Sequence, residues 1–412
     1  MHVAEPQPRT KIEVKRIRSA QGTSMTILYS NLPPDAKAGK QQALAPHGGR
    51  LLAVLRRRGV SPDAIVDFSN NTDVLAESLT DRLIKTIAPE LRHYPETEAP
   101  ALTAALAAHE GVDPSQILPT HGAAEAILVL LAGLRPRRLL LVGPIFSEYA
   151  RTANALGISV EIEPLDPDED FGLTERAVTS ILERIAQTNA DAVILCSPNN
   201  PTGQVYERLP ELAAGLTNTT LLLDQAYRDI AMDDDGRSAT VARYTDLAAA
   251  AGDGVGVACI GSLTKTFACP GLRLGYVVGD AALVDCATGI KPPWSVTALA
   301  QEAGTFFLEH KAEYNATRAP LPGLRRELAA AISALPGVAR VLPSMTNFLC
   351  VRLREGLRPG DVAHALEDRL VLVRDCDDIT GMAPGFLRIQ VRTAEDNTRL
   401  IAALGEVSRS LV

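Results

Sequence analysis

The feature that most constrains the fold of this chain is a repeated alternation between helical segments and short, uniformly apolar segments. The helical segments are alanine-rich or carry apolar residues at helical spacing. Strands that are apolar throughout are typical of a mainly parallel sheet with helices on both faces. The sequence therefore predicts an α/β fold. The expected helices lie at residues 101–111, 121–134 and 173–187. The expected apolar strands lie within residues 137–144, 191–203, 219–227 and 256–265, and residues 158–165 alternate between apolar and polar as a further strand.

The composition changes after residue 300, which predicts a second, smaller domain of α+β type. A long helical connection, broken near Pro320 and Pro322, precedes short strands and a closing helix. We expect a flexible N-terminal extension over residues 1–43, which are polar and have Met25 as an alternative start. The small domain is expected at 44–92 and 308–412, and the large domain at 93–307. The later elements are expected at residues 306–335 for the connection, 347–353, 371–376 and 386–393 for the strands, and 397–410 for the helix.

The bulk composition excludes several classes of function. The net charge is −8, so no overall basic balance attracts nucleic acid or membrane phosphate. No apolar run is long enough to span a membrane. The six cysteines lack metal-ligand spacing, which predicts reduced thiols in a cytoplasmic protein with neither disulfides nor a metal site.

Polar residues follow three of the expected strands. Asn200 lies in SPNNPTG, Asp224 ends the strand in TTLLLDQAY, and Lys265 follows a strand in GSLTK. Ligands bind beyond the carboxyl ends of strands in such sheets. A lysine can act as a nucleophile when burial or a nearby cation removes its proton, and Arg273 follows eight residues later. Taken singly, these residues could equally be a turn residue, a helix cap and a surface lysine.

Together with their neighbours, these residues carry a resemblance to a known family. The series HGAAEAI, SPNNPTG, LDQAY, SLTK and GLRLGY resembles, in order and spacing, the fold-type-I pyridoxal-phosphate (PLP) enzymes of aminotransferase class I/II. The resemblance extends over residues 46–410. It implies the PLP-dependent transferase fold, with a large domain built on a mainly parallel sheet and a smaller α+β domain. It also implies PLP as cofactor.

The resemblance implies roles for residues around the cofactor ring. Lys265 would bind the cofactor aldehyde covalently, and Asp224 would pair with the protonated ring nitrogen so that the ring accepts electrons. Asn200 and Tyr227 would donate hydrogen bonds to the ring's phenolate oxygen. Phe146, in GPIFSEY, would stack on the ring face.

The resemblance also implies where the cofactor phosphate lies. It would sit at the start of a helix, where free backbone N–H groups and the helix dipole favour an anion. Tyr94, in RHYPE, resembles the tyrosine that reaches the phosphate of the neighbouring subunit, so a homodimer with a shared active site is implied. The other phosphate-site residues would be Gly122, Ala123, Ala124, Ser262, Thr264 and Arg273.

Further segments are similar to one branch of this family, the threonine-phosphate decarboxylases of cobalamin biosynthesis. These segments are residues 46–71, 292–304, 371–376 and 386–393. This likeness implies decarboxylation of an O-phosphorylated amino acid, either L-threonine O-3-phosphate to (R)-1-aminopropan-2-ol O-phosphate or the phosphoserine analogue. The substrate would be bound by His47, Gly48, Asn71, Asn200, Arg374, Arg388 and Arg392. Arg392 could equally be a solvated strand residue and His47 an ordinary capping histidine.

Two other functions are possible for a chain of this family, and one segment differs from the family's sequence pattern. A histidinol-phosphate-type aminotransferase using 2-oxoglutarate or glutamate would share the cofactor residues. A catalytically silent protein of the same fold is disfavoured, because residues 1–43 are too short for a DNA-binding winged helix. The departure is NNTDVL (70–75), where the family usually has an Asn-Pro pair. An acid at Asp73 is unfavourable near a phosphate pocket, so either Asp73 points away or the substrate differs.

Overall fold

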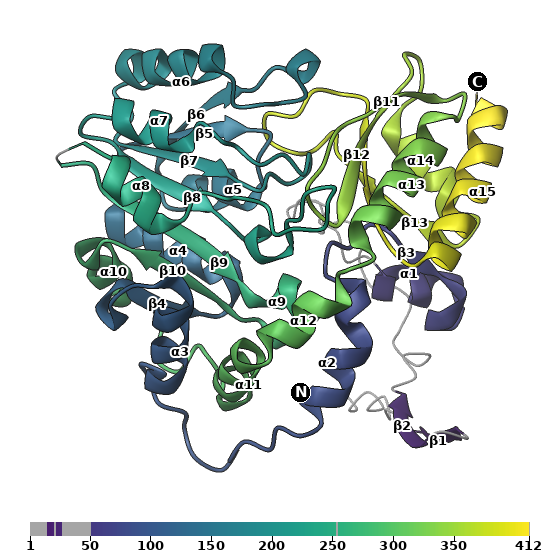
Figure 1. Cartoon of the computed structure of the whole chain (residues 1–412), viewed down its shortest axis with the longest axis horizontal. Coiled ribbons are helices and arrows are strands. Elements are labelled where there is room, and N and C mark those ends of the chain that lie inside the picture. Colours follow the sequence, from purple (N-terminus) through teal and green to yellow (C-terminus); the bar gives the residue numbers. More distant parts are fainter. Residues whose placement is uncertain (1–14, 20–21, 27–50, 253, 412) are drawn as a thin grey trace, which may run out of the picture.

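The computed structural model describes residues 15–19, 22–26, 51–252 and 254–411, and its largest element is a seven-stranded sheet (Figure 1). The strand order is β4-β10-β9-β8-β7-β5-β6. Only β10 runs antiparallel to its neighbours β4 and β9, which confirms the mainly parallel sheet. The strands are β4 (Ile117–Thr120), β5 (Arg138–Gly143), β6 (Ser159–Pro164), β7 (Ala192–Cys196), β8 (Thr220–Asp224), β9 (Val257–Ser262) and β10 (Gly275–Gly279).

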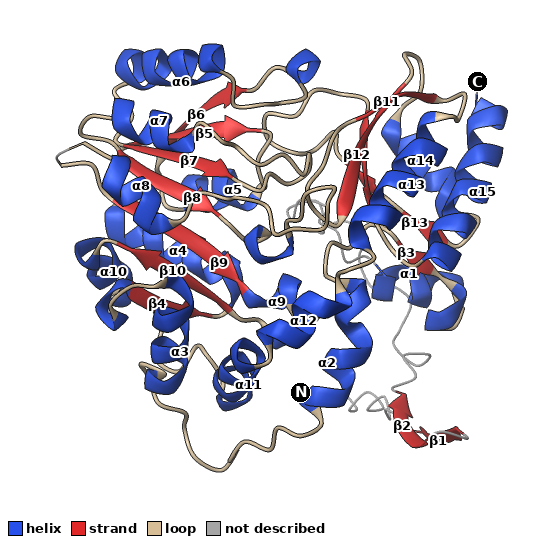
Figure 2. Cartoon of the chain, viewed as in Figure 1, coloured by secondary structure: helices blue, strands red, loops and turns tan. Residues whose placement is uncertain are grey.

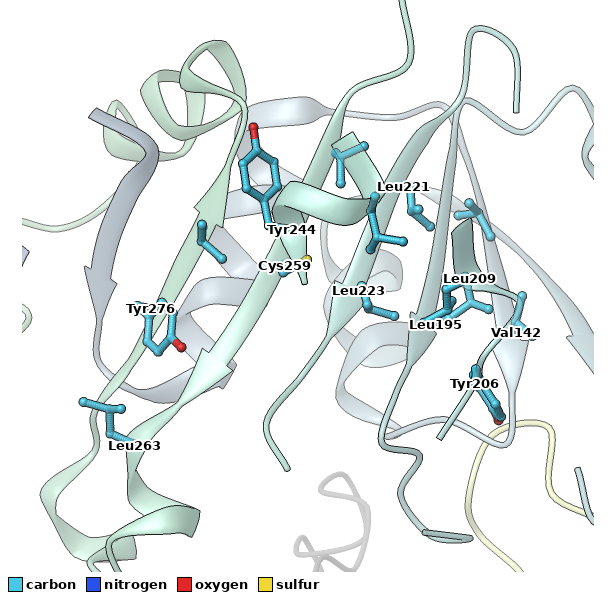
Figure 3. Packing of buried hydrophobic residues seen from close by; sticks show 14 of the residues in the cluster. Val142, Leu195, Tyr206, Leu209, Leu221, Leu223, Tyr244, Cys259, Leu263 and Tyr276 are labelled. Carbon is cyan, nitrogen blue, oxygen red and sulfur yellow. The ribbon is translucent and has the colours of Figure 1, made fainter. Parts of the chain in front are cut away.

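Helices cover both faces of this sheet (Figure 2). Successive strand residues point to opposite faces, so Val142 packs with one group of helices and Leu141 with the other. Figure 3 shows Leu195, Leu221 and Leu223 on the first face. The first face carries α3 (Pro100–Glu110), α6 (Glu175–Thr188), α7 (Leu209–Gly215), α8 (Tyr244–Ala250) and α11 (Ala298–Glu309), and the second carries α4 (Gly122–Leu134), α5 (Glu148–Ala155) and α10 (Ala281–Thr288). These two apolar layers are the reason that the central strands are apolar throughout, whereas the edge strand β6 alternates between apolar and polar residues.

A second, four-stranded antiparallel sheet lies beside the first and has the order β11-β12-β15-β14. The prediction of one strand over residues 371–376 is wrong, because the segment serves two sheets. β13 (Val371–Leu372) pairs in parallel with β3 (Val66–Asp67), and β14 (Arg374–Asp375) pairs with β15. The remaining elements of this part are β11 (Val338–Val341), β12 (Phe348–Leu353), β15 (Phe386–Gln390), α13 (Leu321–Ser333), α14 (Pro359–Glu367) and α15 (Ala394–Leu411).

The helical connection between the two parts is interrupted twice. α12 (Lys311–Thr317) ends before Pro320, as predicted, and α13 then begins with Pro322 in its first turn. Proline is tolerated there because first-turn N–H groups have no intrahelical partner. The interruption at His310, between α11 and α12, was not predicted.

Besides six single-turn 3-10 helices, the described residues also contain three short α-helices and one hairpin. The helices are α1 (Leu51–Arg58), α2 (Glu77–Ile84) and α9 (Leu263–Thr266). Within the segment expected to be an extension, β1 (Lys15–Ser19) and β2 (Gly22–Thr26) form an antiparallel pair. We did not predict this hairpin, and the flexibility expected of residues 1–43 stays a prediction. The hairpin's main chains pair with each other, which requires no apolar periodicity.

The two parts of the chain meet at the carboxyl edge of the large sheet. Tyr227, just beyond β8, packs edge-on against Phe348 of β12, with ring centroids 5.1 Å apart. Main-chain bonds also join the parts, from the Met232 N–H to the Met345 carbonyl (2.7 Å) and from the Asp73 N–H to the Lys265 carbonyl (2.9 Å). The small sheet therefore covers the edge at which the polar residues of the large sheet lie.

Candidate active site

Lys265 lies in α9, the single turn that follows β9, and its amine faces the junction of the two parts. The Nζ atom donates a hydrogen bond to Oδ1 of Asn71 (2.6 Å), and the Asn71 amide donates to the hydroxyl of Tyr227. Burial, with Arg388 and Arg273 nearby, lowers the pKa of Lys265 to about 8. A large fraction of the amine is therefore unprotonated under mildly alkaline conditions, as a nucleophile requires.

Asp224 is the last residue of β8 and is buried. Its Oδ1 accepts from the Ala226 N–H (2.8 Å), and its Oδ2 accepts from the hydroxyl of Tyr149 (2.7 Å). Burial raises the pKa of Asp224, while the donors from Tyr149 and Ala226 and the charge of Lys265 act in the opposite direction. Sequence reasoning missed Tyr149. Its position in GPIFSEY, three residues after Phe146 and in the first turn of α5, was the available signal.

Two arginines of the small sheet lie side by side at the same junction. Arg388 of β15 and Arg374 of β14 are directly paired across the antiparallel ladder, so both side chains lie on one face. Arg388 is buried and donates to Oδ1 of Asn200 (2.6 Å) and to the Ser69 carbonyl (2.7 Å). Its Nε has no hydrogen-bond partner among the described residues. Arg374 donates to Asp378 (2.6 Å).

The start of α4 forms a third group of donors near Lys265. Gly122 adopts a left-handed φ of 76°, and a Cβ at this position would lie 2.6 Å from Nη2 of Arg273. The predicted residues Gly122, Ala123 and Ala124 are thus the first turn of a 13-residue helix, whose N–H groups have no intrahelical partner. Such a helix start, with a guanidinium beside it, is suited to bind a phosphate.

Hydroxyl groups lie at the adjacent end of β9. Ser262, the last residue of the strand, has its Oγ 3.1 Å from Oγ1 of Thr264. β10 begins between these hydroxyl groups and the start of α4, since Gly275 pairs with Ser262 on one side and with Thr120 on the other. A Cβ at Gly275 would lie 2.7 Å from the Ala123 nitrogen, so the close approach requires glycine.

Several predicted residues are not brought to this junction. Tyr94 is 80% exposed and stacks on Trp294, with ring centroids 4.7 Å apart. Arg392 donates to Asp396 (2.9 Å) and lies over the ring of Phe68. His47 and Gly48 lie outside the described residues.

Asn71 and Asp73 have contacts that the sequence did not predict. Asn71, expected among the substrate-binding residues, contacts the amine of Lys265 in the structure. Asp73 is buried and forms an ion pair with Arg318 (2.6 Å), which also donates to the carbonyl of Thr266 (2.8 Å). The charge of Asp73 is therefore balanced by its own partner, and the departure does not require a different substrate.

The described residues offer what PLP requires. A buried carboxylate, an amine of lowered pKa and a helix start flanked by a guanidinium match its ring nitrogen, aldehyde and phosphate. In the part of the chain that the structure describes, no group of three or more His, Cys, Asp or Glu side chains could hold a metal ion. None of the described helices has the length and apolar character to cross a membrane.

The fold and site define a class of protein that sequence comparison identifies directly. Residues 66–404 match the model of the aminotransferase class I and II family, and the chain belongs to that family. Its cofactor is pyridoxal 5'-phosphate.

Three particular proteins show which members the chain is similar to. A threonine-phosphate decarboxylase of Salmonella typhimurium is 34% identical over 370 residues, which cover 88% of this chain and 96% of the relative. A histidinol-phosphate aminotransferase of Acidovorax ebreus is 33% identical over 322 residues, 76% and 83% of the two chains. The crystal structure of the L-threonine-O-3-phosphate decarboxylase from Porphyromonas gingivalis has a TM-score of 0.70 at 28% identity, covering 83% and 99%.

Proposed function

We propose that this chain decarboxylates an O-phosphorylated amino acid, with L-threonine O-3-phosphate as substrate and (R)-1-aminopropan-2-ol O-phosphate as product. The phosphoserine analogue has the same two anionic groups and is the nearest other substrate. The observation that carries the proposal is the 34% identity to a threonine-phosphate decarboxylase over 88% of the chain. The paired arginines Arg374 and Arg388 add support, because the substrate carries both a carboxylate and a phosphate.

The proposed roles follow from the contacts of each residue. Bound PLP supplies an electron sink for the pair left behind when CO2 departs. Arg388 binds one anion of the substrate through its buried Nε, which has no other partner among the described residues. In its ammonium form, Lys265, held by Asn71, would deliver a proton to the carbon that lost CO2 and so become the neutral amine again. Asp224 stabilises a proton on the ring nitrogen of the cofactor.

The same proposal assigns further predicted residues to cofactor and substrate. Asn200 and Tyr227 would donate to the cofactor's phenolate oxygen and Phe146 would stack on its ring. Tyr94 would act from the partner subunit of a homodimer, which its exposure on the surface of one chain supports. The cysteines among the described residues are free, which supports a cytoplasmic location.

Product analysis with O-phosphothreonine tests the reaction. We expect CO2 release in the absence of any oxo acid and at an unchanged rate when 2-oxoglutarate is added. Amino transfer to 2-oxoglutarate without CO2 release would overturn the proposal. A matched reaction with O-phosphoserine ranks the two substrates, and Arg388→Gln should raise KM for both because it removes the buried guanidinium.

A second candidate is a histidinol-phosphate-type aminotransferase. The 33% identity to the Acidovorax ebreus enzyme over 76% of the chain favours it. Histidinol phosphate has no carboxylate, so this reaction releases no CO2. It depends on an oxo acid that accepts the amino group. Turnover of histidinol phosphate with 2-oxoglutarate, and none of O-phosphothreonine, would select this candidate.

A further inference from the structure

Tyr149 is a fully buried tyrosine of α5 whose hydroxyl is directed at Asp224. The hydroxyl lies 2.7 Å from Oδ2 of the carboxylate and donates to it. The ring is held by the apolar layer under the sheet and by Phe146, with ring centroids 6.5 Å apart at an interplanar angle of 88°. The phenol is therefore fixed from both sides.

The carboxylate of Asp224 has few other donors. Its second oxygen accepts from the Ala226 N–H (2.8 Å). The neighbouring thiol of Cys196 donates to the Pro198 carbonyl (3.3 Å) and not to the carboxylate. Among the described residues, Tyr149 is thus the only side chain that donates a hydrogen bond to Asp224.

We propose that Tyr149 is a positioning residue that fixes the Asp224 carboxylate and limits its basicity, and so determines how firmly the ring nitrogen of PLP keeps its proton. This inference rests on the proposed pairing of Asp224 with that nitrogen. It does not depend on whether the reaction is decarboxylation or amino transfer.

The buried carboxylate of Asp224 can be either a neutral acid or an anion. Burial favours the neutral acid, whereas a donor hydrogen bond stabilises the anion. Without the phenol, the carboxylate would compete more strongly for the proton of the ring nitrogen. A neutral ring withdraws electrons less well than a protonated one. The phenol of Tyr149 therefore helps to keep the proton on the ring nitrogen and not on Asp224.

The test compares Tyr149→Phe with Tyr206→Phe as a matched control. Tyr206 is also buried, but its hydroxyl has no partner among the described residues. In the apoprotein, carbon-13 NMR of labelled aspartate should show the Asp224 titration raised by about one pH unit in Tyr149→Phe. Tyr206→Phe should leave it unchanged.

The second measurement is the affinity of the apoprotein for PLP and for an analogue with carbon in place of the ring nitrogen. Tyr149→Phe should weaken PLP binding about tenfold relative to the analogue. An equal loss for both ligands, with an unchanged titration of Asp224, would show a purely structural role and overturn the inference.

A variant that keeps the phenol hydroxyl decides the matter if Tyr149→Phe does not fold. Replacing Tyr149 alone by 3-fluorotyrosine gives a stronger donor and should lower the pH at which Asp224 titrates, whereas no movement or a rise overturns the inference.

Asp224→Asn separates the role of Tyr149 from the proposed pairing of Asp224 with the ring nitrogen. If it abolishes the preference for PLP over the analogue while Tyr149→Phe does not, only the inference fails. If Asp224→Asn also leaves the preference intact, the assignment of Asp224 fails as well.

Discussion

Lys265 owes its reactivity to the residues around it. Its Nζ donates a hydrogen bond to the oxygen of a neutral amide, that of Asn71, and not to a carboxylate. Burial and two guanidinium groups, those of Arg388 and Arg273, oppose the charged form, whereas the charge of Asp224 favours it. Each of these influences comes from a different element, so the pKa of the amine depends on the assembled site.

The pH dependence of labelling at Lys265 tests this account. In the apoprotein, reaction with pyridoxal followed by borohydride should rise with pH through a midpoint near 8, measured by mass spectrometry of the residue 265 peptide. Because Arg273 lowers the pKa of the amine, Arg273→Gln should raise the midpoint and slow labelling at pH 8. Arg392→Gln, which removes a cation paired with Asp396, should leave the midpoint in place. A wild-type midpoint above 10 would contradict the account.

The residues predicted from sequence are those that terminate strands. Asp224 and Lys265 follow apolar runs, and the topology of a parallel sheet brings such ends together. Tyr149 and the Ser69 carbonyl could not be predicted in the same way, because their partners are set by packing between segments. Tyr94 and Arg392 remain predictions, since neither reaches the site within the described chain.

At the scale of elements, the segment between β3 and α2 is fixed to α9 from two sides. The Asp73 N–H donates to the Lys265 carbonyl, and the Asp73 carboxylate pairs with Arg318. Arg318 in turn donates to the Thr266 carbonyl, which adjoins Lys265 in the same turn. Asp73 and Arg318 are 245 residues apart in sequence, so no local pattern predicts their ion pair. Strands were predictable from apolar runs, whereas this contact and the division of residues 371–376 depend on tertiary structure.

Removing one partner of this buried pair should be costly. Asp73→Ala leaves the Arg318 charge buried without compensation, so we expect a loss of about 3–5 kcal/mol in the free energy of unfolding. Adding Arg318→Met should recover most of the loss, because the uncompensated charge is then gone. The measurement is urea denaturation of the apoprotein.

A more exposed ion pair provides the comparison for that measurement. Arg358 and Asp361 lie three residues apart at the start of α14, and both are exposed. Asp361→Ala should cost no more than about 0.5 kcal/mol. If Asp73→Ala costs no more than this, Asp73 and Arg318 do not act as a buried pair.

At the scale of the whole molecule, a single chain leaves a proposed cofactor residue on its surface. Tyr94 and Trp294 stack on each other, and both are exposed. Large exposed aromatic residues that lie together mark interaction surfaces. The division into domains at residues 92/93 and 307/308 stays a prediction, although the two sheets, each with its helices, lie side by side as separate parts (Figure 2).

Mixed dimers test whether Tyr94 acts across subunits. Tyr94→Ala and Lys265→Ala should each be impaired alone, while a mixture that is allowed to exchange subunits regains activity. Random pairing makes half of the dimers mixed, each with one intact site, so about a quarter of wild-type activity is expected.

The control mixes Asp224→Ala with Lys265→Ala. Both residues belong to the same site of one chain, so no mixed dimer has an intact site and no activity should return. If the mixture of Tyr94→Ala with Lys265→Ala also recovers no activity, Tyr94 acts within its own subunit.

The single reversed strand of the large sheet has a consequence for how this site can change. Because β10 returns beside β9, residues 263–274 form one short connection that carries both Lys265 and Arg273. An insertion between Lys265 and Arg273 would change the position of the amine relative to the guanidinium, whereas loops after the other strands can lengthen without changing that spacing. Redesign for a cofactor with a differently spaced aldehyde and anion would therefore have to begin in this connection.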